Sequence, residues 1–92
     1  GVIHITLVLS ERGDLVADPQ ISTAGLFDET DTRDTRVKEE IIDEIEDILA
    51  DMERQDRTDD HVVHEEIRIG IRRFLFSALR LKPTTTVHIV RV

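Results

Sequence analysis

The sequence contains no cysteine, tryptophan or tyrosine, and phenylalanine supplies its only three aromatic side chains. Without cysteine the chain cannot form disulfides or thiolate zinc sites, and it cannot use a cysteine nucleophile. The core must be aliphatic, because hydrophobic residues make up 39% of the 92 residues and aromatics only 3%. No apolar run approaches the roughly 18 residues that a membrane-spanning helix needs. These absences predict one small cytoplasmic domain with no membrane partner.

The familiar motifs of catalysis and phosphate binding are also missing. The sequence has no phosphate-cradling loop, no Rossmann glycine pattern and no evident Ser/His/Asp set. It also lacks the GXXG loop of KH domains and the aromatic run of RRM domains. The net charge of −8 argues against a free-standing nucleic-acid binder, because phosphate contacts need clustered Lys and Arg. We therefore expect no catalytic residue, no metal ligand and no cofactor in this chain.

Alternation of apolar and polar residues over positions 1–26 predicts a β-hairpin. Its first arm is apolar on both faces and is the best candidate for a central strand. Pro19 lies in the second arm and cannot donate a ladder hydrogen bond, so this arm should be an edge strand or contain a bulge. Because termini are usually polar and frayed, a chain that begins inside its most apolar strand is expected to be a domain cut from a longer protein.

A first helix is predicted after an acidic connector. Residues 28–36 show no periodicity and should be solvated. Asp34 and Thr35 are good capping residues for the helix that follows. The apolar positions at helical spacing are Val37, Ile41, Ile45, Ile48 and Met52.

A second helix and a final strand complete the chain. Asp59 or Asp60 should cap the helix, and Pro83 should end it before the β-branched strand 84–92. Gly70 lies inside this helix, where glycine costs about 1 kcal/mol relative to alanine. Close approach of the two helices is the expected reason for it. The apolar positions are Val63, Ile67, Ile71, Phe74, Ala78 and Leu81.

The predicted fold is α+β, a two-layer sandwich in which two helices cover one face of a three-stranded mixed sheet, in the order β-β-α-α-β. The last strand should pair with the first, and Ile3, Ile5, Leu7 and Leu9 should face the helices. The other sheet face has no cover in this chain, and an exposed semi-apolar face usually marks a contact with another chain or domain. The candidate interface residues are Val2, His4, Val8, His88, Val90 and Val92. The two histidines could titrate as a pair at the interface, although a strand histidine is more often packed or solvated.

The segment 61–66, HVVHEE, invites a metal interpretation. Zinc helices of the HExxH kind need histidines four residues apart, whereas His61 and His64 are three apart and no third ligand is evident. An exposed helix N-terminus, where glutamates suit the helix dipole, explains these residues better. The carboxylates of the first helix should likewise form a solvated face, because a catalytic carboxylate needs burial or a close partner. They are Glu39, Glu40, Asp43, Glu44, Glu46, Asp47 and Asp51.

Basic residues gather toward the end of the chain. They are Arg68, Arg72, Arg73, Arg80 and Lys82. One interpretation is a phosphate-contacting stripe beside an RNA path, which would make the chain an RNA-guiding module. The other is complementation of the helix dipole together with ion pairs to the acidic helix. The sequence leaves both open.

The sequence as a whole resembles the C-terminal domain of the ribonuclease J family. The resemblance begins with GVIHITLVLSERGDLVADPQISTAGLFDE, an apolar strand, a Gly-containing turn and a second strand that ends in a Ser/Gly-containing turn. It continues through both helices to ALRLKPTTTVHIVRV, where a basic residue and a proline precede the final strand. Ala24 departs from the family, in which many relatives carry a basic residue before this glycine.

The resemblance implies a bacterial-type cytoplasmic ribonuclease that combines a metallo-β-lactamase domain with a β-CASP domain. Its two-zinc site and its exo- and endonuclease activities would lie upstream of residues 1–92, so zinc is expected in the parent and not here. The C-terminal domain of that family is associated with dimerisation and with full nuclease activity. We therefore expect a non-catalytic assembly domain that forms a homo-oligomer, contacts the upstream domains and meets RNA through the parent enzyme.

Overall fold

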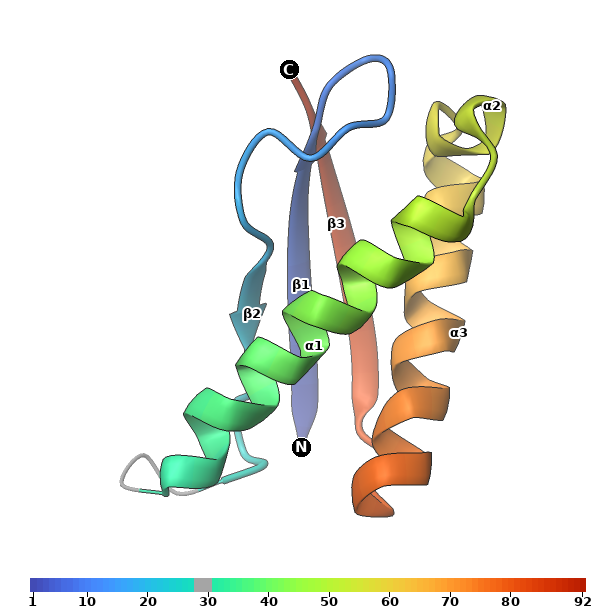
Figure 1. Cartoon of the computed structure of the whole chain (residues 1–92). Helices are drawn as coiled ribbons and strands as arrows, with labels where there is room; N and C mark the ends of the chain where they lie inside the picture. Colours follow the sequence, from blue (N-terminus) through green and yellow to red (C-terminus); the bar gives the residue numbers. More distant parts are fainter. Residues whose placement is uncertain (28–30) are drawn as a thin grey trace.

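Two long helices pack on one face of a three-stranded sheet in an α+β fold (Figure 1). A computed structural model describes residues 1–27 and 31–92. The elements in chain order are β1 (Val2–Leu9), β2 (Gln20–Ser22), α1 (Thr32–Asp51), α2 (Arg54–Arg57), α3 (Asp60–Leu79) and β3 (Thr84–Arg91). The predicted order β-β-α-α-β is confirmed, and the short helix α2 lies between the two long ones.

β1 is the central strand of the sheet, as predicted. The strand order is β2-β1-β3, with β1 antiparallel to β2 and parallel to β3. The predicted edges, which are the proline-bearing arm and the final strand, are confirmed. The second arm is shorter than predicted, because β2 has only three residues and a single isolated bridge joins Leu9 to Leu15. Pro19 has no N–H to donate, so the chain around it leaves the ladder.

α1 begins earlier than predicted. Asp31 is its N-cap, and the Asp31 carboxylate accepts a hydrogen bond from the backbone N–H of Arg33 at 2.9 Å. The predicted cap at Asp34 is therefore wrong, and residues 32–36 of the predicted connector are helical. Residues 28–30 of that connector lie outside the described residues. The first turn carries no apolar side chain, so hydrophobic periodicity could not reveal it.

α3 begins at the predicted place. Asp59 is the N-cap, and its carboxylate accepts a hydrogen bond from the backbone N–H of His61 at 3.0 Å. The helix ends before Arg80, which adopts a left-handed conformation with φ 57°. Leu81 therefore lies beyond the helix and not on its apolar face, where the sequence placed it.

Each long helix buries one row of residues spaced four apart. The rows are Val37, Ile41, Ile45 and Leu49 in α1, and Val63, Ile67, Ile71 and Leu75 in α3. Such a row is inclined to the helix axis, and α1 accordingly crosses the strands obliquely (Figure 1). In α3, Leu75 takes the buried position expected for Phe74, which is only partly buried, and Ala78 is exposed.

The inward side of β1 packs against both rows to form an aliphatic core. Ile3, Ile5, Leu7 and Leu9 are each at most 1% exposed, and the predicted direction of these side chains is confirmed. Gly70 lies where α3 meets α1, and a Cβ at this position would be 2.5 Å from Ile48 Cδ1. The predicted reason for this glycine, close approach of the helices, is therefore confirmed.

Candidate interaction surfaces

The six candidate interface residues share the sheet face that lies opposite the helices, which we call the outer face. β1 and β3 are parallel, and residues that pair across them point to the same side. The outward pairs are Val2 with Thr84, His4 with Thr86, Thr6 with His88, and Val8 with Val90. Val92 continues this alternation past the end of β3, where its backbone N–H donates to the Leu9 carbonyl at 2.9 Å. The structure thus places all six on one surface.

Four valines gather at the end of the outer face where β1 finishes. Val8 lies between Val90 on β3 and Val16, whose backbone N–H donates to the Val8 carbonyl at 3.0 Å. Val16, Val90 and Val92 are 52%, 37% and 65% exposed. We call these four residues the valine patch. Val16 was not among the predicted interface residues; the available signal was its place directly after the apolar Leu15, since neighbouring strand residues point to opposite faces.

The two outward histidines lie nearer the middle of the same face. His4 Nδ1 is 2.6 Å from Thr86 Oγ1, so this imidazole has a partner within the sheet. His88 pairs in register with Thr6 and is therefore diagonal to His4. Their predicted titration as a pair stays a prediction.

The basic residues come together at the corner where α3 gives way to β3, which we call the basic corner. Two adjoining hollows share Arg72 and Lys82. The first hollow, of about 340 Å³, is lined by Ile69, Arg72, Arg73, Phe76 and Lys82. The second, of about 210 Å³, is lined by Arg68, Arg72, Lys82, Pro83, Thr84 and Thr85. Arg80 reaches the corner through its guanidinium, 5.3 Å from the centre of the Phe76 ring.

Arg68 differs from the other basic residues because it already has a carboxylate partner. Its Nε donates to Glu65 Oε2 at 2.9 Å, and its Nη2 donates to Glu65 Oε1 at 3.0 Å. These hydrogen bonds, with a smaller contribution from His64, lower the pKa of the Glu65 carboxyl from 4.5 to about 2. In the described part of the chain no ion pair joins the basic corner to α1, so the ion pairs of the second interpretation do not form there.

The histidines that the sequence singled out on α3, His61 and His64, line neither hollow of this corner. His64 Nδ1 is 3.0 Å from Glu65 Oε2, and His61 is exposed in the first turn of α3. Within residues 1–27 and 31–92, no three His, Asp or Glu side chains are close enough together to hold a metal ion. The predicted acidic side chains of α1 are exposed except for Glu44, which is half-buried. None of the described helices has the length and apolar character needed to cross a membrane.

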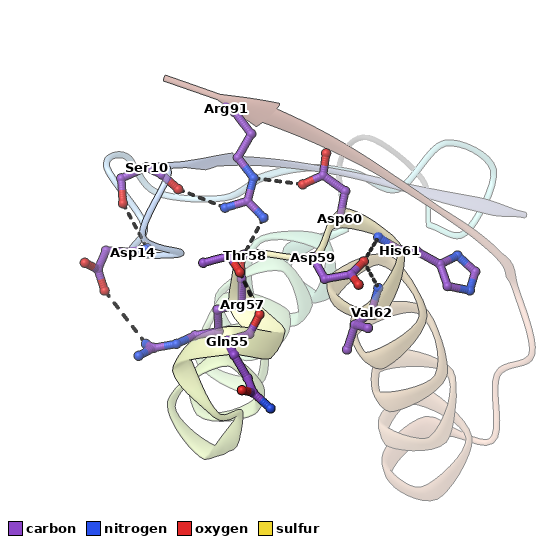
Figure 2. Close-up of polar contacts among 10 residues, drawn as sticks. All are labelled: Ser10, Asp14, Gln55, Arg57, Thr58, Asp59, Asp60, His61, Val62 and Arg91. Atoms are coloured by element: carbon purple, nitrogen blue, oxygen red, sulfur yellow. Dashed lines mark hydrogen bonds and ion pairs between the residues drawn. The ribbon is translucent and has the colours of Figure 1, made fainter.

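Arg91 ties together four segments at the other end of the sheet (Figure 2). Its Nη1 donates to the Ser10 carbonyl at 2.8 Å, and its Nη2 donates to the Arg57 carbonyl at 2.7 Å. Its Nε donates to Asp60 Oδ1 at 2.8 Å. Arg91 was not among the predicted functional residues. The available signal was a charged side chain at an inward position, since Arg91 pairs in register with the buried Leu9.

Comparison with known protein families gives a match over the whole sequence. The family model described as Ribonuclease J C-terminal domain matches residues 1–92. No curated protein matches the chain significantly.

Proposed function

The chain belongs to the ribonuclease J C-terminal domain family, and we propose that it is a non-catalytic assembly domain that pairs with a second copy of itself through its outer face. The observation that carries this proposal is the valine patch. It lies on a sheet face that none of the described helices covers (Figure 1), next to polar side chains of the same face. Clustered, exposed apolar side chains of this kind usually mark a contact surface.

The size of the valine patch indicates a weak contact. Full burial of a valine side chain stabilises by about 2 kcal/mol, and on average about half of each of these side chains is still exposed, so each adds about 1 kcal/mol. Two copies of the patch then contribute about 8 kcal/mol, of which association removes at least about 4 kcal/mol. The surplus corresponds to a Kd of about 1 mM, which hydrogen bonds from the flanking polar residues would tighten. Such a contact becomes effective when other parts of a longer protein hold the copies together.

In this proposal the cleavage of RNA belongs to upstream domains of a longer cytoplasmic enzyme. Those domains, of the metallo-β-lactamase and β-CASP types, would hold the catalytic zinc ions. The residues described here provide no group of three ligands for such an ion. The role of this domain is to bring copies of the enzyme together and so support full exo- and endonuclease activity.

Analytical ultracentrifugation of the 92-residue chain tests the proposal, over protein concentrations from about 10 μM to about 1 mM. We expect reversible self-association that Val8→Glu and Val90→Glu both abolish, because each places a charge in the contact. Leu79→Glu is the matched control, since Leu79 on α3 has the same 37% exposure as Val90. Far-UV circular dichroism should show unchanged helix content in all variants, and Val90→Glu still gives a test if Val8→Glu disturbs folding.

Two results would contradict the proposal. One is a strict monomer throughout this concentration range. The other is equal weakening by Leu79→Glu and Val90→Glu, which would place the contact elsewhere or make it non-specific.

A further inference from the structure

We propose that the basic corner binds an unpaired nucleotide of single-stranded RNA, with the base against Phe76 and the phosphate between Arg72 and Lys82. This site lies at the end of the sheet away from the valine patch, meets the outer face only at Thr84, and does not depend on self-association. The assignment rests on three features of the corner: its shape, its uncompensated positive charge and its exposed apolar floor.

The shape of the basic corner suits one nucleotide. Its two hollows meet at Arg72 and Lys82, which line both of them. The first hollow has an apolar floor for a base. The second is bordered by Thr84, an exposed residue whose hydroxyl can bond to a sugar or a phosphate. A phosphate at the junction would reach both shared cations.

The charge of the corner favours a polyanion. Arg72, Arg73 and Lys82 make no ion pair with any described residue, and no described carboxylate lines either hollow. The strongly acidic surface of the molecule lies on α1, which contributes nothing to these hollows. The net charge of −8 would therefore restrict RNA to the corner without preventing it from binding there. Arg68, which Glu65 engages, is the weakest of the predicted phosphate contacts.

The apolar floor supplies the surface on which a base can stack. Ile69 and Phe76 are 38% and 41% exposed and line the same hollow, so together they form a small exposed apolar patch. Lys82 Nζ lies 4.9 Å and Arg80 Cζ 5.3 Å from the centre of the Phe76 ring. Bases stack on aromatic rings and on guanidinium planes, so both the ring and its arginine offer a platform.

A partner helix with an acidic surface fits the corner less well. Such a helix needs an extended apolar groove that accepts side chains from several turns. Here the exposed apolar floor consists of Ile69 and Phe76, with cations around it. A single nucleotide, with one flat base and one phosphate, matches this arrangement of a small apolar centre and a basic rim.

Fluorescence anisotropy with a short fluorescein-labelled oligoadenylate tests the site. We expect the logarithm of the binding constant to fall linearly with the logarithm of the salt concentration, with a slope of about −2. Arg72, Arg73 and Lys82 should each contribute about −0.7 to this slope on a single strand. Affinity should then fall about 20-fold between about 50 and about 200 mM salt. A duplex RNA of the same length should bind more weakly, since its bases cannot reach Phe76.

Variants separate the two parts of the site. Arg72→Gln should reduce the salt slope to about −1.4. Phe76→Ala should weaken binding about fivefold or more without changing the slope, and Phe76→Tyr should restore it. Arg54→Gln, which removes an exposed arginine on α2, is the matched control and should bind like the parent chain. The three side chains changed, Arg54, Arg72 and Phe76, are all exposed, and circular dichroism checks that each of the four variants is folded.

Any of four results would overturn the proposal. The first two are no binding of oligoadenylate at about 50 mM salt, and binding of duplex RNA as tight as that of the single strand. The other two are full affinity in Phe76→Ala, and a loss of affinity in Arg54→Gln as large as that in Arg72→Gln. Binding of polyglutamate in place of RNA would assign the corner to an acidic protein segment instead.

Discussion

Replacing Arg91 with glutamine should destabilise the fold far more than the replacement of an arginine near the end of a chain usually does. The guanidinium of Arg91 joins the end of β3 to the turn after β1, to the end of α2 and to the start of α3 (Figure 2). Glutamine is shorter, carries no charge and cannot reach three acceptors at once. The variant therefore leaves the carbonyls of Ser10 and Arg57 without their donor.

The size of the expected loss in the free energy of unfolding follows from how exposed each contact of Arg91 is. Asp60 is 61% exposed in its side chain, so its ion pair with Arg91 contributes at most about 1 kcal/mol. The Arg91 side chain is only 21% exposed, and hydrogen bonds from a charged donor contribute about 1.5–3 kcal/mol each. With the lower value for each of the two carbonyl bonds, Arg91→Gln should reduce the free energy of unfolding by about 3 kcal/mol.

Urea unfolding followed by far-UV circular dichroism measures this loss, and tryptophan fluorescence cannot replace it because the chain has no tryptophan. Asp60→Asn removes only the exposed ion pair and should lower the free energy of unfolding by less than about 1 kcal/mol. Arg54→Gln, on the exposed side of α2, should change it by no more than about 0.5 kcal/mol. A loss below about 1 kcal/mol for Arg91→Gln, or an equal loss for Asp60→Asn, would refute the reasoning.

Two further predictions use contrasts within the chain. Gly13→Ala should lower the free energy of unfolding in urea by about 3 kcal/mol, because Gly13 has φ +90° and a Cβ there would collide with Arg57. Gly25→Ala should lower it by only about 1 kcal/mol, because Gly25 also has a positive φ, +77°, but the atom nearest to its Cβ would be 3.6 Å away. Equal losses would contradict this account. The depressed pKa of Glu65, about 2 against 4.5, means that its contribution to stability is complete above about pH 4.5 and disappears as pH falls toward 2. Arg68→Gln should raise this pKa toward its ordinary value in a carbon-13 NMR titration, and an unchanged pKa would show that Arg68 is not the cause.

Patterns of near neighbours in the sequence were enough to predict most of the fold. The alternation in β1 correctly separated its buried side from its outer face, because a strand repeats every two residues whatever surrounds it. The cap of α3 was narrowed to Asp59 or Asp60, of which Asp59 is the cap, and Gly70 was identified as a point of close helix approach, both from local requirements alone. Pro19 marked an edge for the same kind of reason, since a missing N–H excludes a central strand.

Packing decided what these local rules could not. Spacing alone placed Phe74 and Ala78 on the inner side of α3, but oblique packing along a row of every fourth residue buried Leu75 instead. Packing also left Phe76 exposed at the helix end.

The sequence by itself determined the main strands, the two long helices, their order and the uncovered apolar face, because these follow from periodicity, capping and turn chemistry within a few residues. Only the tertiary structure brought Lys82 over the ring of Phe76 and carried Arg91 to the carbonyl of Ser10, 81 positions earlier. The Lys82 contact requires the chain to reverse direction at the left-handed Arg80. The Arg91 contact requires β3 to return beside β1 after the intervening helices. Such a return depends on the crossing angles of packed helices, and no short pattern in a sequence encodes them.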